Sequence, residues 1–216
     1  MKRAQALVSA ERHHKLHAAE DLCYLAITPA AAASDHGAEP HWIVSVRPLE
    51  QYLEPEDESR FWPQWKRWLA GDVARQAPSK LTFLVIDESR DVAVSEECCR
   101  FLQSELGSGA CQFEVAVGRS VEQKCQMLAG ADQVVAMRLH ACLIATASAV
   151  PTMGVAYCAK VEQFFASIPD SNVFPLQDWL AETFPHVDTP QARQPVCLSV
   201  KQQQARENLE ILKSLI

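Results

Sequence analysis

Residues 133–157, QVVAMRLHACLIATASAVPTMGVAY, carry the strongest indication of the fold class. They contain two apolar runs, residues 133–137 and 152–157, on either side of an Ala-rich helical segment, residues 140–149. Pro151 closes the helical segment, because proline cannot continue a helix. A strand, a helix and a second apolar strand in this order are typical of a parallel βαβ unit, in which helices cover both faces of the sheet.

The alternation of apolar runs and helical patterns continues towards both ends of the chain. Strands are expected at residues 42–46, 81–86, 112–117, 133–137 and 152–157. Helices are expected at residues 61–69, 94–106, 121–129, 140–149 and 161–168. Ser120 and Gln123 have the spacing of a capping box, and Gly130 stands where the helix that they begin should stop. The predicted fold class is therefore α/β, with a doubly wound, mostly parallel Rossmann-like sheet.

The N-terminal segment differs in character from this repeating region. Residues 1–40 begin with a His-rich helical pattern and continue into a stretch rich in Ala and Pro, which is typical of a linker. We assign residues 41–216 to the Rossmann-like domain. The last part of this domain, residues 199–216, is predicted to be a polar helix whose apolar stripe packs against a neighbouring surface.

The composition is typical of a compact protein without nucleic-acid or membrane partners. Hydrophobic residues make up 48% of the 216 residues and charged residues 22%, which is close to the globular average. The 27 acidic residues exceed the 20 basic ones, and a net charge of −7 disfavours binding to nucleic acid or an anionic membrane. The longest apolar run, residues 141–151, is too short to span a bilayer, and we expect no secretion signal. The eight cysteines form no C-x-x-C pair and several lie in apolar runs, which favours buried free thiols and a reducing, cytoplasmic location.

Two arginines and a histidine are predicted to converge at one edge of the sheet. In open α/β sheets, ligands bind beyond the carboxyl ends of the strands, where the strand order reverses. With the order 3-2-1-4-5, the first and fourth strands are neighbours; Arg47 follows one, and Arg138 and His140 follow the other. His140 also begins a helix, whose N-terminal amides favour an anion. Taken singly, Arg138 is typical of a surface arginine and His140 of a helix-start residue, but together these groups predict an anion pocket.

Other polar residues follow the remaining predicted strands. We expect most of them to be solvated turn residues or helix caps: Asp87, Glu88, Asp91, Arg119, Ser120, Tyr157 and Lys160. The acidic run at residues 54–58 is expected to be a solvated loop. His13 and His17 have the spacing of a metal pair but lack a third ligand, so a polar helix face is favoured. The sequence has no G-x-G-x-x-G, Walker or G-x-S-x-G motif, which disfavours a dinucleotide cofactor.

Residues 129–161 resemble the signature of polysaccharide pyruvyl transferases. They contain an apolar strand, an M-R-L-H turn, a small-residue helix, a V-P step and a segment similar to S-Y-D-P-K-V, in that order. Residues 43–48, IVSVRP, are similar to the S-x-R-P strand end of that family, and Asp91 and Glu122 match its usual acidic positions. Cys158 departs from the pattern, because the family usually has an aspartate there.

The resemblance covers residues 40–216 and implies one half of a glycosyltransferase-B-like arrangement, in which two Rossmann-like domains face one another. In this interpretation the other half supplies much of the acceptor-sugar site. Residues 1–40 would be a remnant of that half, and a second protein chain is the expected source of the missing part.

The resemblance also implies transfer of a pyruvyl group from phosphoenolpyruvate to a sugar of a cell-surface polysaccharide, as a ketal. Arg47 and Arg138 would bind the phosphate and the carboxylate, because each guanidinium can bind one of them bidentately. His140 would be the general acid. Tyr157 and Lys160 would bind substrate, and no metal or cofactor is needed. Two alternatives remain open, namely a catalytically silent module that binds an anion or a partner, and half of a nucleotide-sugar glycosyltransferase.

Overall fold

The computed structural model describes residues 39–107, 109, 111–166, 172–181, 203 and 206. Apart from Gln203 and Arg206, these residues belong to one compact unit, residues 29–196. The predicted histidine pair of residues 13 and 17 lies outside the described residues, as does nearly all of the predicted C-terminal helix. The domain boundary at residue 40 stays a prediction.

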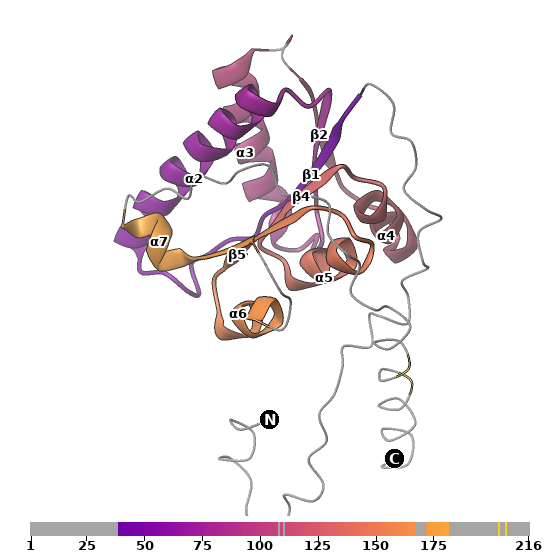
Figure 1. The fold of residues 1–216 in the computed structure, drawn as a ribbon. Coiled ribbons are helices and arrows are strands. Elements are labelled where there is room, and N and C mark those ends of the chain that lie inside the picture. The colour runs from indigo at the N-terminus through magenta and orange to yellow at the C-terminus, as the bar shows by residue number, and fades with distance from the viewer. Residues whose placement is uncertain are drawn as a thin grey trace, which may run out of the picture. The chain divides into compact units, whose positions relative to one another are not determined.

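A six-stranded parallel sheet with the order β3-β2-β1-β4-β5-β6 forms the centre of the unit (Figure 1). The strands are β1 (His41–Ser45), β2 (Lys80–Leu84), β3 (Gln112–Ala116), β4 (Gln133–Ala136), β5 (Thr152–Ala156) and β6 (Asn172–Pro175). Every neighbouring pair is parallel. The predicted α/β class, the doubly wound sheet and the reversal of strand order between β1 and β4 are confirmed.

Helices cover both faces of this sheet (Figure 1). They are α2 (Pro55–Gln76), α3 (Asp91–Leu106), α4 (Val121–Ala129), α5 (Leu139–Ala147), α6 (Ala159–Ala166) and α7 (Leu176–Leu180). Helices α3 and α7 contact α2 in one layer, whereas α4 and α6 contact α5 in the other. The two layers explain why the central strands β1, β2, β4 and β5 are almost entirely buried and mostly apolar, because helices cover them on both faces.

One part of the core joins the sheet to α2. Val44 and Phe83 on adjacent strands are fully buried, as are Trp65 and Leu69 on the helix. Complete burial of side chains of this kind contributes about 1.5–3 kcal/mol each. The apolar stripe of α2 therefore holds the long helix against β1 and β2, and it fixes the turn that follows β1.

Helix α2 begins earlier and ends later than its predicted range, residues 61–69. Pro55 occupies its first turn, and the acidic run that we expected to be a solvated loop supplies the N-cap, Glu54, and the first-turn carboxylates. Carboxylates there interact favourably with the helix dipole, and proline lacks only an N–H that has no helical partner. The prediction of a loop was wrong because the run was judged by its charge and not by its position before an apolar stripe.

Other boundaries follow from local capping. Ser120 and Gln123 form the predicted capping box at the start of α4, and Gly130 ends that helix. Strand β6 was not predicted, because it is a four-residue edge strand that ends in proline and carries little periodic signal.

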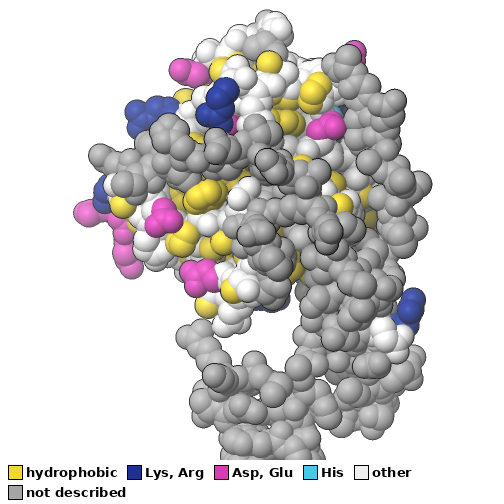
Figure 2. Space-filling view, viewed as in Figure 1, with side chains coloured by type: hydrophobic (Ala, Val, Ile, Leu, Met, Phe, Trp, Pro, Cys, Tyr) yellow, Lys and Arg dark blue, Asp and Glu magenta, His cyan; other side chains and the backbone are white. Residues whose placement is uncertain are grey.

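Acidic, basic and hydrophobic side chains are interspersed over the described part of one face of the molecule (Figure 2). No helix among the described residues is long and apolar enough to cross a membrane. Six cysteines are described, all as free thiols, of which Cys98, Cys99, Cys111 and Cys142 are buried. The prediction of buried free thiols is confirmed for these four, whereas Cys125 and Cys158 are half-buried.

Candidate functional site

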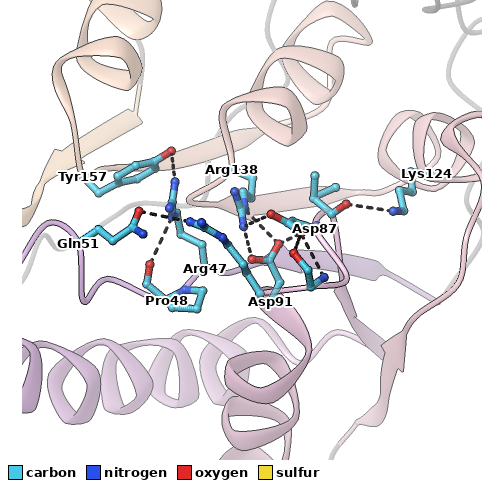
Figure 3. Close-up of polar contacts among 11 residues, drawn as sticks. Arg47, Pro48, Gln51, Asp87, Asp91, Lys124, Arg138 and Tyr157 are labelled. Atoms are coloured by element: carbon cyan, nitrogen blue, oxygen red, sulfur yellow. Dashed lines mark hydrogen bonds and ion pairs between the residues drawn. The ribbon is translucent and has the colours of Figure 1, made fainter.

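Arg47 and Arg138 leave the sheet from equivalent positions of neighbouring strands. Ser45 of β1 is in register with Ala136 of β4, and the Met137 amide donates to the Ser45 carbonyl at 2.8 Å. Each arginine follows its paired residue by two positions, so both lie at the carboxyl edge where the strand order reverses. Figure 3 shows the two side chains next to one another, with Tyr157 on the side of Arg47 and Asp91 and Asp87 on the side of Arg138.

Arg47 is a buried cation whose hydrogen-bond and ring partners are neutral. Only 6% of the residue is exposed, and two hydrogen bonds hold its side chain in place. Nη1 donates to Tyr157 Oη at 2.9 Å, and Nε donates to the Pro48 carbonyl at 3.3 Å. The guanidinium carbon lies 4.7 Å from the ring centroid of Tyr52 and 4.5 Å from that of Tyr157. Within the part of the chain that the structure describes, no carboxylate forms an ion pair with Arg47. Its charge is therefore available to a bound anion.

The protonation states of Arg47 and Tyr157 leave the hydroxyl proton of Tyr157 available for donation. Burial alone would lower the pKa of Arg47, but the hydrogen bond and charge interactions with Tyr157, with a smaller contribution from Tyr52, raise it. Burial raises the pKa of Tyr157, and the hydrogen bond from Arg47 opposes this only in part. At neutral pH the guanidinium is charged and the phenol is protonated. Because a guanidinium can only donate, Tyr157 Oη is the acceptor in their contact and keeps its own O–H for another acceptor.

Arg138 differs from Arg47, because two carboxylates compensate its charge. Its Nε donates to Asp91 Oδ2 at 3.0 Å, and its Nη2 donates to Asp91 Oδ1 and lies 3.5 Å from Asp87 Oδ2. Asp91 is fully buried, so the expectation that it is a solvated turn residue was wrong. Sequence reasoning missed this burial because the partner of Asp91 lies 47 residues further along the chain. The Nε and Nη2 edge of the Arg138 guanidinium is occupied by carboxylates, and Nη1 has no partner among the described residues.

The remaining predicted site residues stand on the rim of the same edge. His140 is exposed at the second position of α5, and Lys160 is exposed at the second position of α6. Helix α5 has Arg138 as its N-cap without a side-chain cap, so its first amides are not satisfied by that residue. The structure brings Arg47 and Tyr157 into direct contact and Arg138 beside them. The roles of all five residues stay predictions.

Tyr52 belongs to the site but was not predicted. It lies in the loop between β1 and α2, its backbone amide donates to the Leu49 carbonyl at 2.8 Å, and its ring meets that of Tyr157 edge to face. Tyr52 is 39% exposed as a residue, and its ring lies over the Arg47 guanidinium. No local pattern marks such a residue, because its partners are brought to it by the sheet.

Comparison with protein families matches residues 46–159, more than half of the chain, to polysaccharide pyruvyl transferase. The matched range contains Arg47, Asp91, Arg138, His140 and Tyr157, and it ends one residue before Lys160. A search of curated protein sequences gave no significant match.

Solved structures with a similar fold include glycosyltransferases. A mutant of Thermobaculum terrenum O-GlcNAc transferase aligns with a TM-score of 0.43 and 12% identity, over 86% of this chain and 35% of that protein. Escherichia coli heptosyltransferase WaaC with ADP aligns with a TM-score of 0.36 and 19% identity, over 80% of this chain and 45% of that protein. The chain thus spans less than half the length of either structure. Because the family model matches residues 46–159, which contain the arginines at the carboxyl edge of the sheet, the chain belongs to the polysaccharide pyruvyl transferase family.

Proposed function

We propose that this chain takes part in the transfer of a pyruvyl group from phosphoenolpyruvate to a saccharide, with a cyclic ketal and inorganic phosphate as products. The observation that carries the proposal is the buried, uncompensated guanidinium of Arg47 at the switch point of the sheet, in a chain of this family. A cation in this state favours an anionic ligand, because water supplies little of its solvation.

The donors around Arg47 suit the two acidic groups of phosphoenolpyruvate. Arg47 and the free O–H of Tyr157 are adjacent donors for one group. The Nη1 side of Arg138 and the first amides of α5 are donors for the other, and a helix N-terminus favours negative charge. Lys160, exposed at the start of α6, adds a cation on the rim. In this assignment Arg47 contributes an uncompensated positive charge to the site, whereas Arg138, whose charge is compensated by carboxylates, orients the anion through its Nη1 donors.

The reaction requires one proton at the methylene carbon and the departure of phosphate. We assign the proton donor to His140, which is exposed beside Arg138 and can exchange protons with solvent. Protonation of C3 leaves a cationic C2, to which one sugar hydroxyl adds with loss of its proton. The bond from C2 to the phosphate oxygen then breaks, a second hydroxyl of the same sugar closes the ketal with loss of its proton, and phosphate takes up one proton.

The acceptor site is expected to need more protein than the described unit. The chain spans less than half the length of the solved structures that it resembles. In a two-domain arrangement the opposing domain would face the edge that carries Arg47 and His140, and it would hold the saccharide there. We therefore propose that a second domain or chain completes the acceptor site.

A transfer assay tests the proposal. The purified chain is incubated with phosphoenolpyruvate and a panel of oligosaccharides, alone and with lysate of the source cell, while phosphate release and product mass are measured. We expect sugar-dependent phosphate release and a ketal product. His140→Ala should abolish turnover and keep phosphoenolpyruvate binding, whereas His41→Gln, at the amino end of β1, is the matched control and should keep both.

The outcomes separate the proposed function from its two alternatives. Binding of phosphoenolpyruvate without turnover, even with lysate, would favour a silent anion-binding module. Binding of a nucleoside diphosphate together with no affinity for phosphoenolpyruvate would favour half of a nucleotide-sugar glycosyltransferase.

A further inference from the structure

We propose that Asp91 is a positioning residue that holds the guanidinium of Arg138 in one orientation, so that only its Nη1 side faces an anion at the strand ends. The inference rests on the proposed function, because it assigns Asp91 to the anion site. It adds a residue whose side chain acts on the ligand through Arg138 and not by contact.

The contact between the two side chains uses both oxygens of one and two nitrogens of the other. Asp91 Oδ2 accepts from Arg138 Nε at 3.0 Å, and Asp91 Oδ1 accepts from Nη2. A bidentate contact of this kind fixes the plane of the guanidinium as well as its position. Nη2 also faces Asp87 Oδ2 at 3.5 Å, so the donors without a described partner are those of Nη1.

Asp91 is itself held in place by the turn between β2 and α3. Its Oδ2 accepts the backbone N–H of Asp87 at 2.9 Å, and its own N–H donates to the Asp87 carbonyl at 2.8 Å. Asp87 Oδ1 accepts from the N–H and the hydroxyl of Ser89, at 3.1 and 2.6 Å. The turn thus holds the Asp91 carboxylate in place through hydrogen bonds that do not involve Arg138.

The ion pair joins segments that follow two non-adjacent strands. Asp91 follows β2 and Arg138 follows β4, and β1 lies between these strands in the sheet. The pair therefore bridges the carboxyl end of β1, beside Arg47 (Figure 3). Its place at the switch point distinguishes it from a buried pair that serves packing alone.

A matched control exists in the same protein. Asp72 is another buried aspartate that pairs with an arginine, Arg75, in the last turn of α2, which leads to the amino end of β2. Asp72→Asn therefore removes a buried carboxylate at the opposite edge of the sheet, from a local pair whose arginine side chain is more exposed than that of Arg138 (54% against 15%). A purely structural effect of a lost buried carboxylate should be alike in Asp91→Asn and Asp72→Asn.

The experiment is a double-mutant cycle on turnover of phosphoenolpyruvate, together with ¹⁵N NMR of the arginine Nε–H groups during titration with inorganic phosphate. Asp91→Asn should lower kcat/KM by about 10- to 100-fold in the native background and by less than about 3-fold in an Arg138→Met background, because residues that act as a unit are not additive. Phosphate should shift the Nε–H signal of Arg138 in the native protein and in Asp72→Asn, and should leave it unshifted in Asp91→Asn. Asp91→Glu, which keeps the charge, covers the case in which Asp91→Asn does not fold, and it should restore part of the phosphate response.

Several results would overturn the inference. One is an equal loss of kcat/KM from Asp91→Asn in both backgrounds. Another is a phosphate response of Arg138 that is the same in Asp91→Asn and Asp72→Asn, and a third is a native Arg138 signal that phosphate does not shift. The NMR arm does not depend on turnover, so a protein that binds phosphate through Arg138 but does not react with phosphoenolpyruvate would contradict the proposed function and still support the role of Asp91.

Discussion

Replacement of Arg47 by methionine should weaken anion binding strongly and change stability little. In the folded protein the guanidinium makes two hydrogen bonds, to Tyr157 and Pro48, and lies over two tyrosine rings. Loss of two hydrogen bonds costs about 1–3 kcal/mol in total, and loss of the ring contacts costs about 1–2 kcal/mol. Removal of a buried cation without a carboxylate partner relieves a desolvation penalty of several kcal/mol. The free energy of unfolding should therefore change by less than about 2 kcal/mol.

Anion binding lacks such an offset. A hydrogen bond to a charged group contributes about 1.5–3 kcal/mol, so Arg47→Met should weaken the binding of phosphoenolpyruvate and of inorganic phosphate by about 12- to 140-fold. The affinity of Arg47→Lys should fall between those of the native protein and Arg47→Met, since lysine keeps the charge but lacks the planar guanidinium. Arg100→Met, on the exposed side of α3, is the matched control and should leave affinity unchanged.

Calorimetric titration at fixed ionic strength measures the affinities, and chemical denaturation measures the free energy of unfolding. The reasoning would be refuted by the opposite pattern, in which Arg47→Met destabilises the protein by more than about 4 kcal/mol and leaves anion affinity within 2-fold of the native value. Arg47 would then be a structural residue whose charge is satisfied by its tyrosine neighbours.

Three further substitutions or reactions test the packing around the site. Gly154→Ala should destabilise the fold by about 1–3 kcal/mol in denaturation experiments, because the added Cβ would fall against the ring of Phe165 on α6; an unchanged midpoint would show that this ring can move freely. Ser120→Ala should cost about 0.5–2 kcal/mol, since it removes the cap of α4, and a loss below that range would mean that Gln123 caps the helix alone. Burial raises the pKa of Cys142 to about 12, so a thiol reagent at about pH 8 should label the half-buried Cys158 well before Cys142, as read by peptide mass spectrometry; equal rates would contradict the buried placement of α5.

Local patterns predicted the four central strands of the sheet well, because β1, β2, β4 and β5 are almost entirely buried and are therefore mostly apolar. The strands at residues 42–46 and 133–137 were placed within one residue of β1 and β4. Helix boundaries were harder to predict wherever a polar segment begins a helix. The first turn of α2 carries three acidic residues after Pro55, and charge alone does not distinguish an exposed loop from a helix start.

Given the strand order 3-2-1-4-5, the sequence predicts that Arg47 and Arg138 lie at one edge of the sheet, because each follows a strand and parallel strands end at the same edge. Which of the two arginines has its charge compensated follows from the side-chain contacts in the folded protein. Arg138 pairs with Asp91 across β1, whereas Arg47 forms no ion pair among the described residues and contacts the neutral side chains of Tyr52 and Tyr157. Side-chain partners of this kind come from distant parts of the chain, and their charge compensation depends on burial and on distances of a few ångströms, which no local pattern of residues encodes.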